Sequence, residues 1–91
     1  MQDWESFKGE FRRLLKERYG AQRVFLYGSL AWGGFREGSD LDLLVEGFAG
    51  PYWPMYLEAE RLGAPFEVNM VLAEEAHPSL LEAVRKDGIP L

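Results

Sequence analysis

Apolar residues near the start of the chain recur at every third or fourth position. Within residues 3–19 these apolar positions are Trp4, Phe7, Phe11, Leu14 and Leu15. Such spacing places apolar side chains along one face of an α-helix. Gly20 then stands at a position typical of a helix end. The pattern therefore predicts an amphipathic helix over residues 3–19.

Three later segments have the short, apolar character of buried β-strands. They cover residues 23–27, 40–46 and 66–72, and turn-forming residues bound the first two closely. β-branched, aromatic and leucine side chains dominate all three, as is typical of strands that are covered on at least one face. We therefore predict three strands at these positions.

Helical segments are expected between the strands. Residues 30–35 would form a turn or two of helix, and a loop over 48–54 leads into a helix that starts at Pro54 and covers 55–62. A last helix is expected from Pro78 to about residue 86. The resulting order, α-β-α-β-α-β-α, predicts an α/β fold in which helices flank a three- to four-stranded sheet.

Composition narrows the possible classes of protein. The chain has 91 residues, a net charge of -5 and no cysteine. Its length fits a single domain over residues 1–91. The lack of cysteine excludes disulfides, thiolate zinc sites and cysteine nucleophiles. No apolar run is long enough to span a bilayer, so we expect a cytoplasmic protein without membrane contact. The acidic balance argues against direct nucleic-acid binding.

Two acidic residues stand at the start of an otherwise apolar strand. Asp40 and Asp42 are one residue apart, so both side chains would project to the same face of the strand. Aspartate is disfavoured in strands, and local rules are broken most often at functional sites. The pair could bind one hard cation, or it could simply form a solvated face.

Gly28 and Ser29 end the first strand where a short helix is expected. A glycine there lets the backbone approach an anion, and a helix N-terminus offers free N–H groups to phosphate. Taken alone, the dipeptide is equally typical of a tight turn with a capping serine. A phosphate-binding turn beside a carboxylate pair is, however, the arrangement that metal-assisted phosphoryl transfer requires.

The spacing of these residues resembles that of a known family. Gly28-Ser29, ten intervening residues and Asp40-Leu41-Asp42 match the signature of the DNA polymerase β-like nucleotidyltransferases. Tyr27 and residues 39–45 are similar to the minimal nucleotidyltransferase (MNT) branch. The resemblance implies a palm-like α+β fold with a mixed sheet. It also implies that Gly28 and Ser29 bind a nucleoside triphosphate, that Asp40 and Asp42 bind Mg²⁺, and that a third carboxylate completes a two-metal site.

The chain departs from this family at the third carboxylate. Alignment without gaps places Asn69 there. An amide oxygen can bind Mg²⁺ but has no charge and cannot accept a proton, which weakens the second metal position. Glu67 is a candidate substitute for this carboxylate, although it precedes Asn69 by two residues and so lies about 6.6 Å from it along the strand. It would need a strand shift or bulge to reach the site, and otherwise it is a solvated strand residue.

A second departure is Trp32, which replaces an arginine common in the family and would lie in the core or at an interface. Among other polar residues, His77 is expected to cap the last helix rather than bind a metal. Glu46 shares the face of Asp42 but lies about 13 Å from it, too far to share a metal.

Two further groups could contact another chain. The first helix carries a basic stripe, which is either a solvated face or a partner surface: Lys8, Arg12, Arg13 and Lys16. Tyr52 and Trp53 fall in the predicted loop, where aromatic residues favour contacts with other chains or form a lid.

The resemblance implies a Mg²⁺-dependent enzyme that transfers a nucleoside monophosphate, AMP from ATP, to an acceptor hydroxyl. By the same resemblance, the acceptor is a tyrosine of a helical HEPN toxin, and this chain is the antitoxin. A homo-oligomer is also compatible with the sequence. The alternative is a degenerate module that neutralises its partner by contact, or one that binds nucleotide without turnover. Asn69 favours these alternatives, whereas the intact Gly28-Ser29 and Asp40/Asp42 motifs oppose them.

Overall fold

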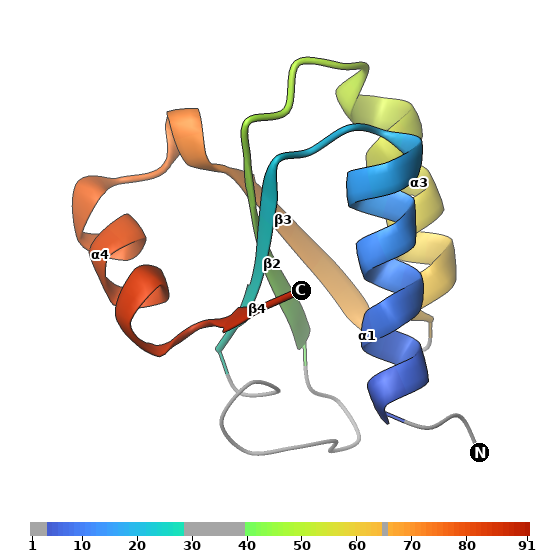
Figure 1. The fold of residues 1–91 in the computed structure, drawn as a ribbon, viewed down its shortest axis with the longest axis horizontal. Helices are drawn as coiled ribbons and strands as arrows, with labels where there is room; N and C mark the ends of the chain where they lie inside the picture. Colours follow the sequence, from blue (N-terminus) through green and yellow to red (C-terminus); the bar gives the residue numbers. More distant parts are fainter. Residues whose placement is uncertain (1–3, 29–39, 65) are drawn as a thin grey trace.

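The computed structural model describes residues 4–28, 40–64 and 66–91, which are built around a four-stranded sheet (Figure 1). Its strands are β1 (Arg23–Tyr27), β2 (Asp40–Glu46), β3 (Glu67–Leu72) and β4 (Ile89–Pro90). Their order across the sheet is β3-β2-β1-β4. β2 runs antiparallel to β1 and parallel to β3, and β4 pairs antiparallel with β1. This mixed sheet confirms the predicted fold class.

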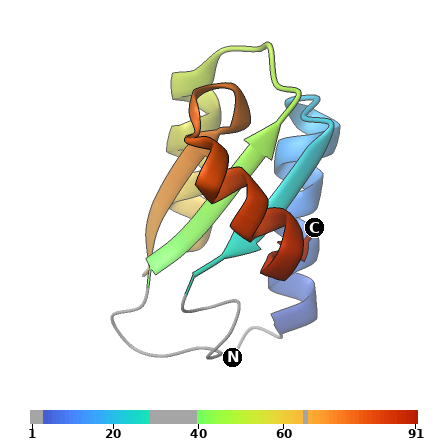
Figure 2. The same ribbon diagram turned by 90° about the vertical axis from the view of Figure 1, so that its left-hand side faces the viewer.

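Helices cover both faces of the sheet (Figures 1 and 2). They are α1 (Trp4–Arg12), the π-helical turn η1 (Arg13–Arg18), α3 (Tyr52–Gly63), the 3-10 turn η2 (Ala73–Glu75) and α4 (Pro78–Asp87). α1 and α3 lie on one face, whereas α4 crosses the other. None of these helices has the length and apolar character that a membrane span requires. The helical turn expected over 30–35 lies outside the described residues.

The two faces of β2 have different partners. Alternate residues Leu41, Leu43 and Val45 are buried in the main core beneath α1 and α3. On the opposite face Leu44 is fully buried on the side that α4 covers, and Val84 of α4 is buried as well. Period-two alternation thus gives one strand an apolar face against two helices and a mixed face towards α4.

The first helix changes its winding before it ends. Residues Arg13–Arg18 form a π-helical turn, after which the Tyr19 amide donates to the Leu14 carbonyl at 3.2 Å. Gly20 follows with a φ of 77°, which glycine adopts without steric strain. The prediction of a first helix that ends at Gly20 is confirmed, but its second half is wound more loosely than an α-helix.

The helix that follows β2 begins earlier than predicted. α3 starts at Tyr52 rather than Pro54, so the prediction that Tyr52 and Trp53 lie in a loop is wrong. Pro54 is the third helical residue, and the N–H groups of a first turn have no partner within the helix. A proline there removes no hydrogen bond, so it does not need to be the first residue. Tyr52 and Trp53 therefore occupy fixed positions on a helix.

Candidate active site

The candidate residues of neighbouring strands meet in one row across the sheet. Asp42 is in register with Tyr27 on β1 and with Asn69 on β3. Paired residues in adjacent strands project to the same face, so these three side chains are neighbours. It is the face that α4 covers farther along the strands, and in Figure 2 the start of β2 extends beyond α4. The row therefore stands at the end of this face that α4 does not reach.

Gly28 brings the backbone of β1 against the carboxylate of Asp42. Its φ is 81°, in the region that L-residues with a side chain rarely adopt. A Cβ atom placed on Gly28 would lie 2.3 Å from Oδ2 of Asp42, which no real contact allows. This position therefore requires glycine for its conformation, and an added Cβ would also have to displace the Asp42 carboxylate. The two motifs that the sequence places twelve residues apart are neighbours in the structure, whereas Ser29 lies outside the described residues.

The Asp42 carboxylate lies near the like charge of Asp40 and accepts a hydrogen bond from Asn69. The side-chain amide of Asn69 donates to Oδ1 of Asp42 at 3.3 Å. Burial raises the pKa of the Asp42 carboxyl, the hydrogen bond from Asn69 opposes that rise, and the charge of Asp40 adds to it. Within residues 4–28, 40–64 and 66–91, no ion pair joins either aspartate to a basic side chain. Among the described residues, the two carboxylates thus lie close together with no basic side chain paired to them.

Tyr27 completes the row on the β1 side. It is half-buried, and both burial and the charge of Asp42 raise the pKa of its hydroxyl. The phenol therefore stays protonated beside the carboxylates. Tyr27 directly precedes Gly28 and pairs with Asp42, so it borders the site on the β1 side.

Together with the neighbouring Asp40, the row's Asp42 and Asn69 form a donor set that fits Mg²⁺. Two carboxylates and one amide offer only oxygen ligands of the kind that Mg²⁺ prefers, and Mg²⁺ commonly completes its shell with water and phosphate oxygens. Asn69 directs its N–H group at Asp42, so its amide must rotate to present oxygen to a cation. Asp40 and Asp42 could therefore bind a metal directly, and Asn69 could do so only after giving up its hydrogen bond.

Glu67 has a different position from Asn69. It is exposed and in register with Asp40, whereas Asn69 is in register with Asp42. The register of β3 with β2 is unbroken from Asp40 to Val45. β3 therefore has no bulge there that would let Glu67 take the place of the third carboxylate. Among the described residues, no three His, Cys, Asp or Glu side chains form a possible metal site.

Two other polar residues take structural roles. The His77 side chain accepts a hydrogen bond from the Ser79 amide at 3.2 Å, which confirms that it caps α4. Glu46 lies on the face of Asp42 but at the opposite end of β2, where Arg85 of α4 approaches it to 3.8 Å. Neither residue is available to the aspartate row, in agreement with the sequence-based interpretation.

A hollow beside β3 was not predicted from the sequence. It has a volume of about 380 Å³ and is lined by Tyr52, Trp53 and Tyr56 of α3 and by residues 68–71 of β3, Asn69 included. The hydroxyls of Tyr56 and Tyr52 donate to the carbonyls of Val68 and Met70 at 3.2 and 3.4 Å. The spacing of Tyr52 and Tyr56 by one helical turn is a signal that could have been recognised, had the helix been predicted to begin early enough.

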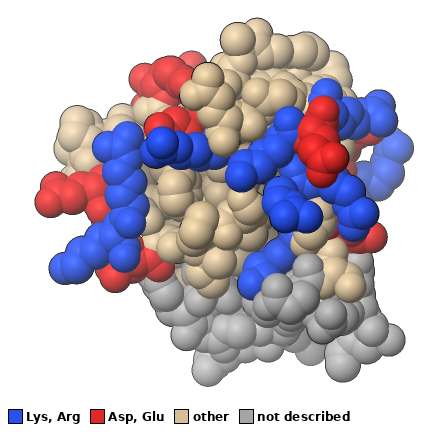
Figure 3. Space-filling view, in the orientation of Figure 1, with Lys and Arg blue, Asp and Glu red and all other residues tan. Residues whose placement is uncertain are grey.

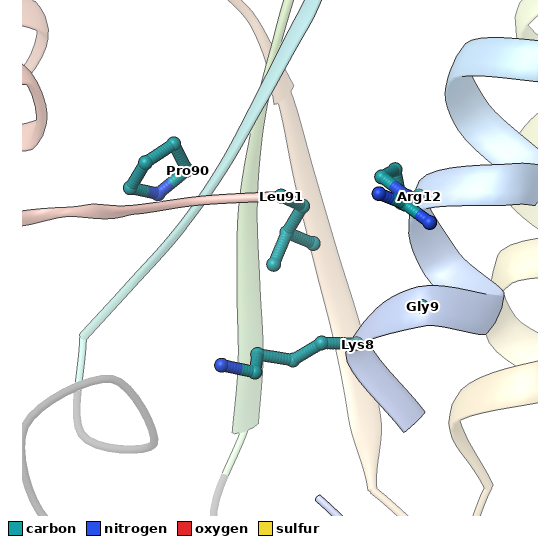
Figure 4. Close-up of a pocket in the computed structure, with 5 residues that line it drawn as sticks. All are labelled: Lys8, Gly9, Arg12, Pro90 and Leu91. Carbon is teal, nitrogen blue, oxygen red and sulfur yellow. The ribbon is translucent and has the colours of Figure 1, made fainter. Parts of the chain in front are cut away.

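Another hollow lies at the opposite edge of the sheet. It has a volume of about 240 Å³, and Figure 4 shows Leu91 between β4 and the side chains of Lys8 and Arg12. Basic side chains gather over this side of the molecule in Figure 3. Part of the predicted basic stripe therefore lines a hollow at the β4 edge. None of its lining residues belongs to the aspartate row.

Comparisons with known proteins identify a related domain family and related structures. A model of the nucleotidyltransferase domain matches residues 8–89. A solved minimal nucleotidyltransferase is 35% identical, over 99% of this chain and 97% of its own, with a TM-score of 0.76. None of the curated proteins matches.

Two more distant structures share the fold. A mutant form of the toxin–antitoxin MntA-HpeT is 18% identical over 91% of this chain and 70% of its own, with a TM-score of 0.75. A toxin–antitoxin with AMP-PNP is 20% identical, with the same coverage and the same TM-score. At these identities the similarity shows the fold alone.

Proposed function

The chain belongs to the nucleotidyltransferase domain family, and on that premise we propose that it transfers AMP from ATP to an acceptor hydroxyl. The observation that supports this most directly is the contact of Gly28 with Asp42. A phosphate-binding turn and a metal-binding carboxylate are useful to each other only when they are adjacent. In this chain the separation is so small that even a methyl group would not fit between them.

The residues of the two motifs have proposed parts in the reaction. The backbone at Gly28 and Ser29 binds the β- and γ-phosphates and holds the triphosphate in one orientation. Mg²⁺, held by Asp40 and Asp42, would supply positive charge that neutralises the phosphates. The acceptor oxygen forms a bond to the α-phosphorus while the bond from that phosphorus to the bridging oxygen breaks. Pyrophosphate leaves, and the hydroxyl proton passes to water.

Asn69 limits the rate of the proposed reaction. It has no charge with which to bind a second cation and no basic site that could remove the acceptor proton. A positioned general base commonly accelerates a reaction by about 10²- to 10⁴-fold. We therefore propose slow turnover that depends on Asp40 and Asp42.

The proposed acceptor is a tyrosine of a helical HEPN-type toxin, with this chain as its antitoxin. The support is that two structures of similar fold are described as a toxin–antitoxin, one of them with AMP-PNP. A tyrosine hydroxyl is a suitable nucleophile because transfer of a nucleotide to it yields a stable phosphodiester.

A second candidate function is neutralisation by contact without catalysis. Asn69 favours it, because the chain lacks the family's third carboxylate. Asp40 and Asp42 oppose it, because two neighbouring carboxylates that have no basic partner among the described residues raise the energy of the folded chain and give a pure scaffold no benefit.

Incubation with α-labelled ATP, Mg²⁺ and the toxin distinguishes these functions. Label on the toxin that disappears with Asp42→Ala supports the enzyme. The matched control is Glu82→Gln, which removes an exposed carboxylate on α4 and should leave transfer unchanged. Toxin neutralisation that persists in Asp42→Ala without any label transfer would instead support neutralisation by contact.

A further inference from the structure

Three aromatic side chains of α3 form a continuous surface at the β3 edge of the sheet. The rings of Tyr52 and Tyr56 stack with centroids 5.9 Å apart and planes at 16°. The Trp53 ring meets both at steep angles, 5.4 Å from Tyr52 and 5.9 Å from Tyr56. We call Tyr52, Trp53 and Tyr56 the aromatic shelf. Mutual packing holds its rings in fixed positions.

A structural role explains the positions of Tyr52 and Tyr56 in the shelf but does not explain the exposure of Trp53. Both tyrosine hydroxyls donate to carbonyls of β3, and this covers part of a strand that pairs with β2 alone among the described strands. Trp53, by contrast, is 66% exposed, the largest exposed apolar side chain among the described residues. An exposed tryptophan fixed by neighbouring rings is typical of a binding surface.

The hollow beneath the shelf shares Asn69 with the proposed active site. Asn69 lines this hollow and also donates to Asp42 on the face of the sheet opposite to α3. A group in the hollow therefore reaches the proposed metal-binding carboxylate by passing around the β3 edge at Asn69.

The order of the strands determines the side from which an acceptor enters. In-line displacement requires the nucleophile to approach opposite the leaving group. The proposed phosphate site is at Gly28, on the β1 side of Asp42, and pyrophosphate leaves on that side. The opposite side of Asp42 is Asn69 on β3, beyond which lies the hollow.

The charges around the shelf favour a basic polypeptide. Burial raises the pKa of the Tyr56 hydroxyl, and the nearby charges of Glu60 and Glu67 raise it further. In the part of the chain that the structure describes, no Lys or Arg lines the hollow. Exposed aromatic faces attract cations and acidic neighbours repel phosphates, so a cationic peptide fits where a nucleic acid would not.

We propose that the aromatic shelf is the docking site for the acceptor segment of the protein substrate. This segment is basic, places a cationic side chain over Trp53, and directs its hydroxyl past Asn69 towards Asp42. The inference rests on the proposed nucleotidyl transfer, but docking itself needs neither nucleotide nor metal.

Binding of short fluorescent peptides without ATP or Mg²⁺ tests the docking site. The probes are an Arg/Lys-rich peptide with one central tyrosine and a matched Asp/Glu-rich peptide, and fluorescence anisotropy is the readout. We expect the basic peptide to bind and the acidic one not to bind. Trp53→Ala should weaken binding of the basic peptide at least tenfold, and Trp53→Phe should retain most of it. The melting temperature of each variant shows whether it is folded.

The matched control is Leu57→Ala on the same helix. Leu57 is 53% exposed but does not line the hollow, so this variant should bind the basic peptide as the wild type does. Equal binding of the basic peptide by wild type and folded Trp53→Ala would overturn the docking site. Equal loss in Leu57→Ala, or preference for a single-stranded oligonucleotide, would overturn it as well.

Label transfer to the toxin is measured separately on the same variants. Transfer by the wild type that is unaffected in Trp53→Ala would overturn the docking site and leave the proposed function intact. Peptide binding that depends on Trp53, together with no transfer to any acceptor, would overturn the proposed function and leave the docking site intact.

Discussion

Asn69 donates its side-chain amide to Oδ1 of Asp42 at 3.3 Å, from the register position directly beside it on the parallel strand β3. A carboxylate in place of Asn69 would stand equally close and would repel Asp42 unless a cation lay between them. The amide thus stabilises the charged form of Asp42 without metal. The same hydrogen bond must break before Asn69 can offer its oxygen to a metal.

Asn69→Asp should increase AMP transfer and decrease stability without metal. The new carboxylate adds a ligand charge and a potential general base, for which we expect a gain on the order of 10²-fold in transfer rate. Loss of the hydrogen bond should lower the free energy of unfolding by about 1 kcal/mol without Mg²⁺. Single-turnover label transfer and chemical denaturation with and without Mg²⁺ measure the two effects. An unchanged transfer rate would contradict the assignment of Asn69 to the third carboxylate position.

Gly28→Ala should abolish nucleotide binding and transfer. The added Cβ would lie 2.3 Å from Oδ2 of Asp42 and must displace the carboxylate, the backbone or both. The matched control is Gly20→Ala, because Gly20 has a similar φ of 77° but no atom within 4 Å of a new Cβ. Both variants should lose about 1–2 kcal/mol through backbone strain. Only Gly28→Ala should lose ATP binding in titration calorimetry, and intact binding there would contradict the proposed phosphate site.

The raised pKa of Asp42 predicts a stability that decreases with pH. Burial is the largest cause, and it gives the folded chain a greater proton affinity than the unfolded one. The contribution of this carboxyl is fully present below its ordinary pKa of 3.8 and is lost as the pH rises through the higher folded-state value.

Asp42→Asn removes this titration but keeps an oxygen that can accept from Asn69. We therefore expect the variant to melt at a higher temperature than the wild type near neutral pH, without divalent cations. The difference should shrink towards acidic pH. Thermal unfolding followed by circular dichroism from about pH 4 to about pH 8 measures it. A lower melting temperature of the variant near neutral pH would show that the charge of Asp42 is stabilised by another group.

Replacing two helical glycines, Gly63 and Gly9, by alanine should change the free energy of unfolding in opposite directions. At Gly63 a Cβ would lie 2.6 Å from Cγ2 of Val68 and 3.0 Å from Cδ1 of Leu41, so Gly63→Ala should cost about 1–3 kcal/mol. At Gly9 the nearest atom is an Arg13 guanidinium nitrogen at 3.9 Å. Gly9→Ala should therefore stabilise α1 by about 0.5–1 kcal/mol. Urea unfolding of both variants measures the pair, and two changes of the same sign would refute the proposed packing at one of the sites.

The periodicity of the sequence was sufficient for much of the fold. Alternation along residues 40–46 predicted that Asp40 and Asp42 share a face, because side chains alternate in any extended strand. The helix before β1 and its end at Gly20 followed from helical spacing and a terminal glycine. Each of these is a local property of the backbone, so no long-range contact was needed to predict it.

Other features of the site depend on which strands become neighbours. Only the parallel register of β2 and β3 places Asn69 beside Asp42 and Glu67 beside Asp40, and a shift of two residues could have placed Glu67 beside Asp42 instead. The hollow at the β3 edge likewise requires α3 to fold back against the strand that follows it. The sequence by itself determined which side chains could share a face. The tertiary structure decided which of them meet, because strand order and register depend on burying the whole core at once.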